Sequence, residues 1–399
     1  MQSDIPTLFV EINLSNIIFA FGTYDENQNF KVIDKVIVPN KDINKNKFTN
    51  IIQAQEIIKK NIEIIEKKSN YIFKEVIVIL DNFEFLCLNI SGFKKLNGSQ
   101  VLKENIFYIL NSLKLSVTEH EKEKTILHIF NSKSVLDGIC NDNLPIGLFG
   151  DFYNHELSFF MVANNDLKNI KQIFNKNNLN VKKILIKQFI EGTHLINQNN
   201  DSEIFFKIKI TKNNSYIYFF EKSSLKYVES FKFGTDIIFK DIEKVCSLHH
   251  ETVEKILSDN FIDNKNFENN EFLEKKYFIN ENYRKIRKKL ILDIADVRIN
   301  EIGNIIFNNN INLKFFKKNY GKIFLFIEDQ PTLKNFKKNF KSYFSQNINF
   351  KTNLIHDLEV DLIIMNAAKI LIQGWKKEAI PMTQTKSSLI TRIFKSLFG

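Results

Sequence analysis

The same order of predicted elements occurs twice in this chain, roughly 200 residues apart. In each copy, three strand-like runs precede a helical stretch and then a buried strand. The predicted elements are strands Thr7–Asn13, Asn16–Gly22 and Phe30–Val38, helix Phe48–Lys67 and strand Glu75–Leu80 in the first copy, and strands Glu203–Ile210, Ser215–Glu221, Leu225–Phe233 and Lys322–Ile327, with a helix from Asp236, in the second. The pattern predicts an α/β protein with a duplicated core.

Each copy carries an insertion, and the two insertions differ. Between Asn82 and Val162, short strands surround a helix predicted over Ser99–Leu113, which is typical of a small α+β module. Those strands are predicted at Phe85–Ile90, Thr125–Asn131 and Glu156–Val162. The second insertion, Asp236 to Phe307, is mostly helical and charged, and its longest helix is predicted from Asn282 to Asn308. A final helix is predicted over Val360–Gln373.

Composition limits the class of protein. With 399 residues, 44% of them hydrophobic, and 39 phenylalanines, the chain can build several cores. The net charge of +10 is spread along a chain rich in Asn and Ile, so we interpret it as compositional bias and predict no nucleic-acid partner. The cysteines Cys87, Cys140 and Cys246 are distant and odd in number, which favours a reducing compartment. The first residues lack the basic region of a secretory signal.

The last fourteen residues, Lys386–Gly399, form a predicted amphipathic helix. Its apolar half consists of Leu389, Ile390, Ile393, Phe394, Leu397 and Phe398, and its polar half includes Arg392 and Lys395. Such a helix is too short to span a bilayer, which needs about 20 residues, but it suits an anionic membrane surface. The alternative is packing on the body of the protein; the polar stretch before it, with Pro381, favours a flexible tether instead.

One segment carries a resemblance to a known family. Leu127–Gly150 contains Leu136, Asp137 and Gly138, followed a few residues later by Pro145, Ile146 and Gly147. In order and spacing these two turns resemble the inserted subdomain, called 1C, of FtsA, the actin-like bacterial cell-division protein. Similarity extends to Ala163–Leu179, Ser224–Gly234 and Arg298, and so runs over nearly the whole chain.

The resemblance implies a duplicated actin-like (ribonuclease H-like) fold and a role in cell division. It divides the chain into subdomain 1A (1–82 and 163–196), subdomain 1C (83–162), subdomain 2A (197–235 and 308–352), helical subdomain 2B (236–307), a helix returning to 1A (353–375), a tether (376–388) and a membrane-targeting helix (389–399). The implied function is to anchor the FtsZ ring to the cytoplasmic face of the inner membrane at the septum. The implied partners are the FtsZ carboxyl-terminal peptide, further copies in a filament, anionic lipid and later division proteins.

In that family the FtsZ peptide docks on the helical subdomain of the second half. The candidate contacts here are Arg284, Arg287, Lys288 and Lys289, whose charge suits an acidic peptide. A solvated helix face explains the same residues equally well.

The nucleotide-binding turns of the family are altered in this chain. Where the family has an aspartate followed by isoleucine, glycine, threonine and serine, the chain has Glu11–Ser15, and where it has an aspartate before three glycines, the chain has Lys209. The degenerate positions are Glu11, Asn13, Ser15, Lys209, Thr211, Lys212, Asn213, Glu328 and Asp329. No two of the 12 glycines are adjacent, so no phosphate-binding loop can be drawn.

We therefore predict no cofactor, weak or absent binding of ATP and Mg²⁺, and negligible hydrolysis. Two alternatives stay open: an ATP-binding protein in which Lys209 and Lys212 grip phosphate directly, and a pilus-assembly adaptor like PilM. Cys246, His249 and His250 lie close together, but without an evident fourth ligand they predict no metal site.

Overall fold

The computed structural model describes residues 5–13, 15–40, 43–44, 47–48, 50–81, 84–198, 203–259, 271–318, 320–328, 336–374 and 377–379. The chain divides into two compact units. Unit 1 comprises Met1–Asn199, Lys222–Lys226 and Leu358–Gly399, and unit 2 comprises Asn200–Glu221 and Tyr227–Asp357. Among the described residues, no helix is long and apolar enough to cross a membrane.

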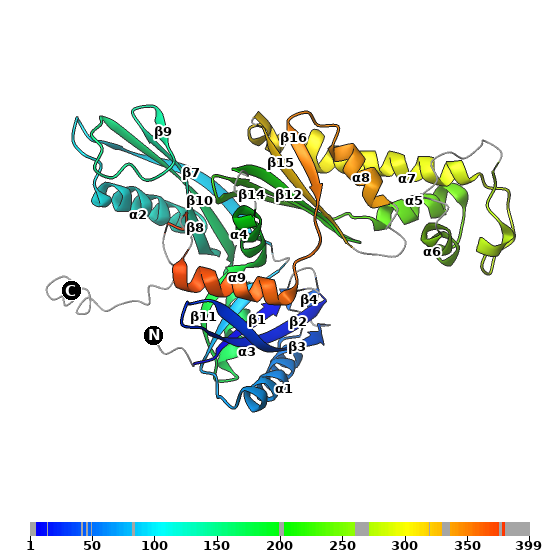
Figure 1. Cartoon of the computed structure of the whole chain (residues 1–399), viewed down its shortest axis with the longest axis horizontal. Helices are drawn as coiled ribbons and strands as arrows, with labels where there is room; N and C mark the ends of the chain where they lie inside the picture. Colours follow the sequence, from blue (N-terminus) through cyan, green and yellow to red (C-terminus); the bar gives the residue numbers. More distant parts are fainter. Residues whose placement is uncertain are drawn as a thin grey trace. The chain divides into compact units, whose positions relative to one another are not determined.

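Unit 1 is built on a five-stranded sheet in the order β11-β6-β1-β2-β3. Its elements are β1 (Thr7–Ile12), β2 (Asn16–Tyr24), β3 (Phe30–Pro39), β4 (Ile43–Asn44), β5 (Lys47–Phe48), α1 (Ile51–Ser69), β6 (Glu75–Leu80), α3 (Asn164–Asn175), β11 (Asn180–Ile186), α4 (Lys187–Gln198) and α9 (Val360–Gln373). Strands β1, β6 and β11 run parallel, and β1 is antiparallel to β2. Helices α1 and α3 cover one face of this sheet, and α4 and α9 cover the other (Figure 1).

Unit 2 repeats this sheet, in the order β14-β13-β12-β15-β16. Its elements are β12 (Ile204–Ile210), β13 (Ser215–Glu221), β14 (Ser224–Phe231, whose first three residues are counted with unit 1), α5 (Asp236–Cys246), α6 (His250–Ser258), η2 (Lys275–Tyr277), α7 (Lys288–Gly303), η3 (Asn304–Asn308), η4 (Ile311–Leu313), η5 (Phe316–Lys318), β15 (Gly321–Ile327), α8 (Phe336–Phe344) and β16 (Phe350–Leu354). One face of the sheet packs on α5 to α8 through a continuous core. Because the sheet order and strand directions match those of unit 1, the predicted duplication is confirmed.

The insertion in unit 1 forms a four-stranded sheet, β7-β10-β8-β9, with one helix packed on it. Its elements are β7 (Leu86–Lys95), α2 (Lys103–His120), β8 (Lys124–Leu136), β9 (Ile139–Asn141) and β10 (Phe152–Ala163). Asp137 and Gly138, at φ 48° and 82°, form the tight turn between β8 and β9. The Asp137 carboxylate accepts hydrogen bonds from the amides of Asp151 and Phe152. The motif that carried the resemblance is therefore a structural turn.

Three helices have different limits from those predicted. Asn50 caps α1, because its side chain accepts from the Gln53 amide, so the helix begins at Ile51. Helix α2 begins at Lys103, since the Val101 amide donates to Leu148 and holds the chain extended. It then continues to His120, beyond the predicted end.

The long helix of unit 2 begins at Lys288, six residues later than predicted, and ends in a π-helical turn, η3. Residues 271–273 pair with residues 286–288: the Leu273 amide donates to Ile286, and the Lys288 amide donates to Glu271. These long-range hydrogen bonds keep Ile286 extended and buried, so they override the local helical pattern.

The predicted tether, 376–388, is not a free linker in the part that the structure describes. Residues 377–379 are paired with strand β8 and are not free. The remaining tether residues and the predicted membrane helix, 389–399, lie outside the described residues, as does Trp375.

Candidate functional site

Parallel strands β1, β6 and β11 end at the same edge of the sheet of unit 1, which is where open α/β sheets bind their ligands. Glu11 is the penultimate residue of β1, and Asp81 directly follows β6. Lys187 and Gln188 begin α4, immediately after β11. Four polar side chains are therefore brought to one place by the order of the strands.

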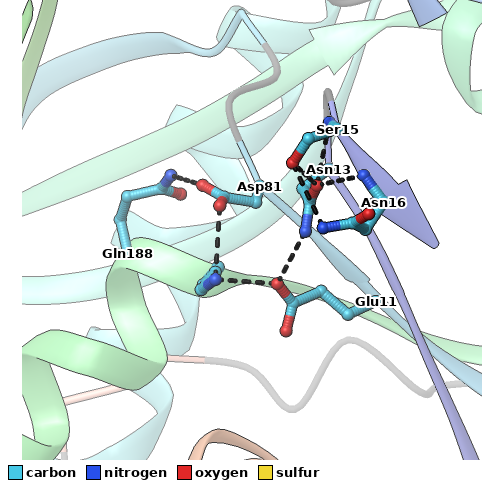
Figure 2. A network of polar contacts seen from close by, with 7 residues as sticks. Glu11, Asn13, Ser15, Asn16, Asp81 and Gln188 are labelled. Atoms are coloured by element: carbon cyan, nitrogen blue, oxygen red, sulfur yellow. Dashed lines mark hydrogen bonds and ion pairs between the residues drawn. The ribbon is translucent and has the colours of Figure 1, made fainter. Parts of the chain in front are cut away.

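These four side chains form one buried cluster (Figure 2). Nζ of Lys187 lies 2.7 Å from Oε1 of Glu11 and 3.3 Å from Oδ2 of Asp81. Nε2 of Gln188 donates to Oδ1 of Asp81 at 2.9 Å. A lysine ammonium thus lies between the two carboxylates that face this edge of the sheet.

The charged groups of the cluster shift one another's pKa values. Burial alone would lower the pKa of Lys187, but Asp81, Glu11 and Glu191 more than reverse this, so its pKa lies well above the usual value. Burial raises the pKa of Glu11, Lys187 opposes this rise, and the neighbouring Asp81 adds to it, so the pKa lies above the usual value. Oε2 of Glu11 and Oε1 of Gln188 are buried without hydrogen-bond partners among the described residues. The Lys187 ammonium therefore compensates part of this buried negative charge.

The turn between β1 and β2 is capped by the side chain of Asn13, which belongs to the turn. Oδ1 of Asn13 accepts hydrogen bonds from the amides of Ser15 and Asn16, at 3.0 and 2.7 Å, and from the Ser15 hydroxyl at 3.0 Å (Figure 2). Amides of this kind are the groups that a phosphate would need in a phosphate-binding turn. Here they are already occupied by an acceptor from within the turn.

The turn between β12 and β13, in unit 2, is capped in a comparable way. The Lys212 amide donates to Oε2 of Glu328 at 2.7 Å, and the Asn214 amide donates to Oγ1 of Thr211 at 3.2 Å. Glu328 reaches the turn because β15 pairs with β12, and its own amide donates to Ile210. A protein carboxylate therefore takes the amide that an anionic ligand would use.

The side chains of the other predicted positions of this second site differ in their burial. Lys209 is buried, 7% exposed, with Nζ 5.8 Å from the centre of the Phe326 ring. Lys212 and Asn213 are exposed. Asp329 lies outside the described residues.

Replacing Gly234 with Ala is expected to destabilise unit 2 by about 1–3 kcal/mol, because a methyl group at this position overpacks a tight contact. A Cβ atom there would lie 2.0 Å from the carbonyl oxygen of Thr211 and 2.6 Å from that of Lys212. Those carbonyls also accept from the amides of Thr235 and Asp236. Urea unfolding measures the change, with the exposed Asn213→Ala as a control within about 0.5 kcal/mol. Equal stability of both variants would contradict a closely packed turn.

The candidate contacts for an acidic peptide lie in one stretch of unit 2, but only two are helical. Arg284 and Arg287 precede α7, and Lys288 and Lys289 begin it. Arg284 pairs with Glu281 at 2.9 Å, and Lys288 pairs with Glu271 at 3.3 Å. Local carboxylates thus already partner Arg284 and Lys288.

Sequence reasoning missed Asp81, Lys187 and Gln188. Asp81 could have been found, since it follows a correctly predicted parallel strand next to β1. Lys187 and Gln188 were missed because β11 was not predicted: only its second half, Ile184–Ile186, is apolar. Among the described residues no group of His, Cys, Asp and Glu side chains could hold a metal ion. Cys246 ends α5, and His250 begins a separate helix.

No protein-family model matches the sequence, and no curated protein matches it. Solved structures do resemble it. The PilM-PilN type IV pilus biogenesis complex aligns with a TM-score of 0.53 at 8% identity, over 94% of this chain and 98% of that chain. MreB5 of Spiroplasma citri bound to ADP aligns with a TM-score of 0.44 at 10% identity, over 94% of this chain and 98% of that chain. The ethanolamine utilization protein EutJ from Carboxydothermus hydrogenoformans aligns with a TM-score of 0.42 at 7% identity, over 93% of this chain and 89% of that chain. The two matching sheets and the likeness to PilM establish that this chain has the duplicated actin-like ATPase fold.

Proposed function

We propose that this protein is a non-enzymatic actin-like adaptor, which needs no nucleotide and links an assembly of protein filaments to a membrane surface. The observation that carries the proposal is the ammonium of Lys187, which lies 2.7 Å from Glu11 and 3.3 Å from Asp81. Two carboxylates at this edge of an actin-like sheet are the expected ligands of the Mg²⁺ that accompanies ATP. The residues present do not fit that metal, because an ammonium and a divalent cation cannot share one position.

The capped turns support the same proposal. A phosphate at the turn of unit 1 would have to displace Asn13 from two amides, and a phosphate at the turn of unit 2 would have to displace the Glu328 carboxylate from one amide. Glu328 would in addition repel a phosphate by its negative charge. We therefore assign no step of ATP hydrolysis to this chain.

The more specific role that we propose is anchoring of the FtsZ ring to the inner membrane, at its cytoplasmic face. Its support is the resemblance of the sequence to FtsA and the amphipathic pattern of Lys386–Gly399. One such helix binds weakly, so attachment would require several copies acting together along a filament. The acidic FtsZ peptide would meet the exposed Arg287 and Lys289 at the start of α7.

Sedimentation with vesicles containing anionic lipid tests the membrane contact. Deleting residues 386–399 should abolish co-sedimentation, and Ile393→Glu should weaken it about tenfold or more, because one apolar side chain contributes about 1.5–3 kcal/mol when buried. Thr391→Glu changes charge equally on the polar half of the same helix and should have a much smaller effect. Undiminished binding of the deletion variant would overturn the membrane role.

A second candidate is an adaptor in type IV pilus assembly, which the likeness to the PilM-PilN complex favours. The two candidates differ in the peptide that the protein would bind. Calorimetric titration with an FtsZ carboxyl-terminal peptide and, separately, with a PilN peptide distinguishes them. Binding of the PilN peptide alone would replace the FtsZ role and leave the nucleotide-free adaptor in place.

A further inference from the structure

A short segment after α9, Lys377–Ala379, lies along strand β8; we call it the strap. The Asn131 amide donates to the Lys377 carbonyl at 2.6 Å, and the Ala379 amide donates to the Ile129 carbonyl at 2.7 Å. Phe130 and Glu378 form an antiparallel bridge between these hydrogen bonds. The strap therefore acts as an additional strand of the inserted sheet.

The strap pairs with β8 on the edge opposite β10, where the Ser224 hydroxyl, on β14, also donates to the Asn131 carbonyl at 2.7 Å. Strand β10 pairs along one edge of β8, and β9 pairs with the other edge only at Ser134–Leu136. Without the strap, the amide of Asn131 and the carbonyl of Ile129 would lie at an open strand edge. Such an edge is a template for an extended peptide.

The side chain of Glu378 enters a buried basic site beneath the strap. Oε1 lies 3.2 Å from Nδ1 of His128, on β8, and Oε2 lies 3.6 Å from Nζ of Lys183, on β11. The Glu378 side chain is 4% exposed, and those of His128 and Lys183 are 0% and 8% exposed. Burial alone would raise the pKa of Glu378, but His128 and Lys183 more than reverse this, so its pKa lies below the usual value. The site thus holds a charged carboxylate.

We propose that the edge of β8 at Ile129–Asn131 is a peptide-binding site that selects an extended segment with a glutamate at its centre, and that the strap occupies it in cis. Backbone hydrogen bonds to β8 align the segment, and Lys183 with His128 recognises the carboxylate. Because an uncompensated buried ammonium is strongly unfavourable, a segment without the acid is rejected. Release of the strap opens the site to an acidic peptide of a partner protein. The proposal rests on residues of unit 1 alone and is independent of the nucleotide-free adaptor role.

Amide hydrogen exchange of the full chain tests whether the strap occupies the edge of β8. In the native protein the amides of Asn131 and Ala379 should be protected, because each donates across the strap. Glu378→Ala should speed the exchange of both at least about tenfold, while the amides of the central strand β10 stay protected. Glu359→Ala, which removes an exposed carboxylate just before α9, is the matched control. Unprotected Asn131 and Ala379 amides in the native chain would overturn the strap.

Binding of synthetic peptides tests the selectivity. A labelled peptide with the sequence of residues 375–381 should bind the Glu378→Ala chain, whose site is open, at least about tenfold more tightly than it binds the native chain. The same peptide with Gln in place of its glutamate should bind at least about tenfold more weakly. Equal binding of both peptides, or no binding of either, would overturn the site. If Glu378→Ala fails to fold, Ala379→Pro removes one hydrogen-bond donor of the strap and opens the same edge for both measurements.

Discussion

Replacing Lys187 with Met should lower the free energy of unfolding by about 3–5 kcal/mol, because it removes one partner of a buried ion cluster. Glu11 is 0% exposed and Asp81 is 4% exposed, so neither carboxylate can recover its hydration when the ammonium is lost. One oxygen of Glu11 already lacks a hydrogen-bond partner among the described residues, which makes the loss harder to accommodate. Urea unfolding, followed by circular dichroism, gives the difference directly.

A surface ion pair of equal length provides the control for this variant. Nζ of Lys182 also lies 2.7 Å from a carboxylate, that of Glu75, but both side chains are at least half exposed. Lys182→Met should therefore cost less than about 1 kcal/mol. Adding Glu11→Gln to Lys187→Met should recover part of the lost stability, since it removes the Glu11 carboxylate that has lost its ion-pair partner. Equal effects of the two single variants would contradict an ion cluster that stabilises the fold.

Acid should destabilise the native protein through His155, and His155→Leu should reduce that loss by about 3 kcal/mol between pH 7 and pH 4. Burial lowers the pKa of His155 from 6.5 to about 4, and a smaller contribution from Lys377 acts in the same direction. Neither ring nitrogen has a hydrogen-bond partner among the described residues. In the unfolded chain His155 binds a proton below about pH 6.5, whereas in the folded chain it binds one only below about pH 4. The free energy of unfolding therefore decreases as the pH falls through this range.

Urea unfolding at pH 7 and pH 4 measures this effect. His120→Leu replaces an exposed histidine of the same inserted subdomain and controls for the loss of a titrating side chain. Other groups, such as Glu378, also contribute to acid sensitivity, so the difference between His155→Leu and the native chain is the quantity to compare. An unchanged pH dependence in His155→Leu would mean that this histidine is protonated equally in both states.

Much of the fold could be predicted because the hydrophobic pattern matches the final burial. Strands Glu75–Leu80 and Ser215–Glu221 and helix Val360–Gln373 have the predicted limits, since the apolar residues of the two strands are buried and the helix has one buried apolar face. The duplication was visible for the same reason. Predictions failed where contacts between distant residues set the local structure, as at Ile286, whose carbonyl is held by Leu273.

The candidate site was predicted only in part. Substitutions at the two turns were visible in the sequence, so turns of altered chemistry could be predicted from Asn13 and the missing glycines. The position of the Lys187 ammonium between the two carboxylates could not be predicted, because it depends on the parallel pairing of β11 with β6. Likewise nothing local indicates that Glu378 reaches His128, a residue 250 positions earlier in the chain. Both features come from the topology of the sheets.

The central claim is that this actin-like protein works without nucleotide, and calorimetric titration of the full chain with Mg²⁺-ATP tests it most directly. Because the Lys187 ammonium lies between Glu11 and Asp81 and the turn amides already have acceptors, we expect no saturable heat up to about 1 mM ATP, which corresponds to a binding free energy weaker than about −4 kcal/mol. A dissociation constant in the micromolar range, dependent on Mg²⁺, would contradict the account and would identify the chain as a nucleotide-binding member of its fold.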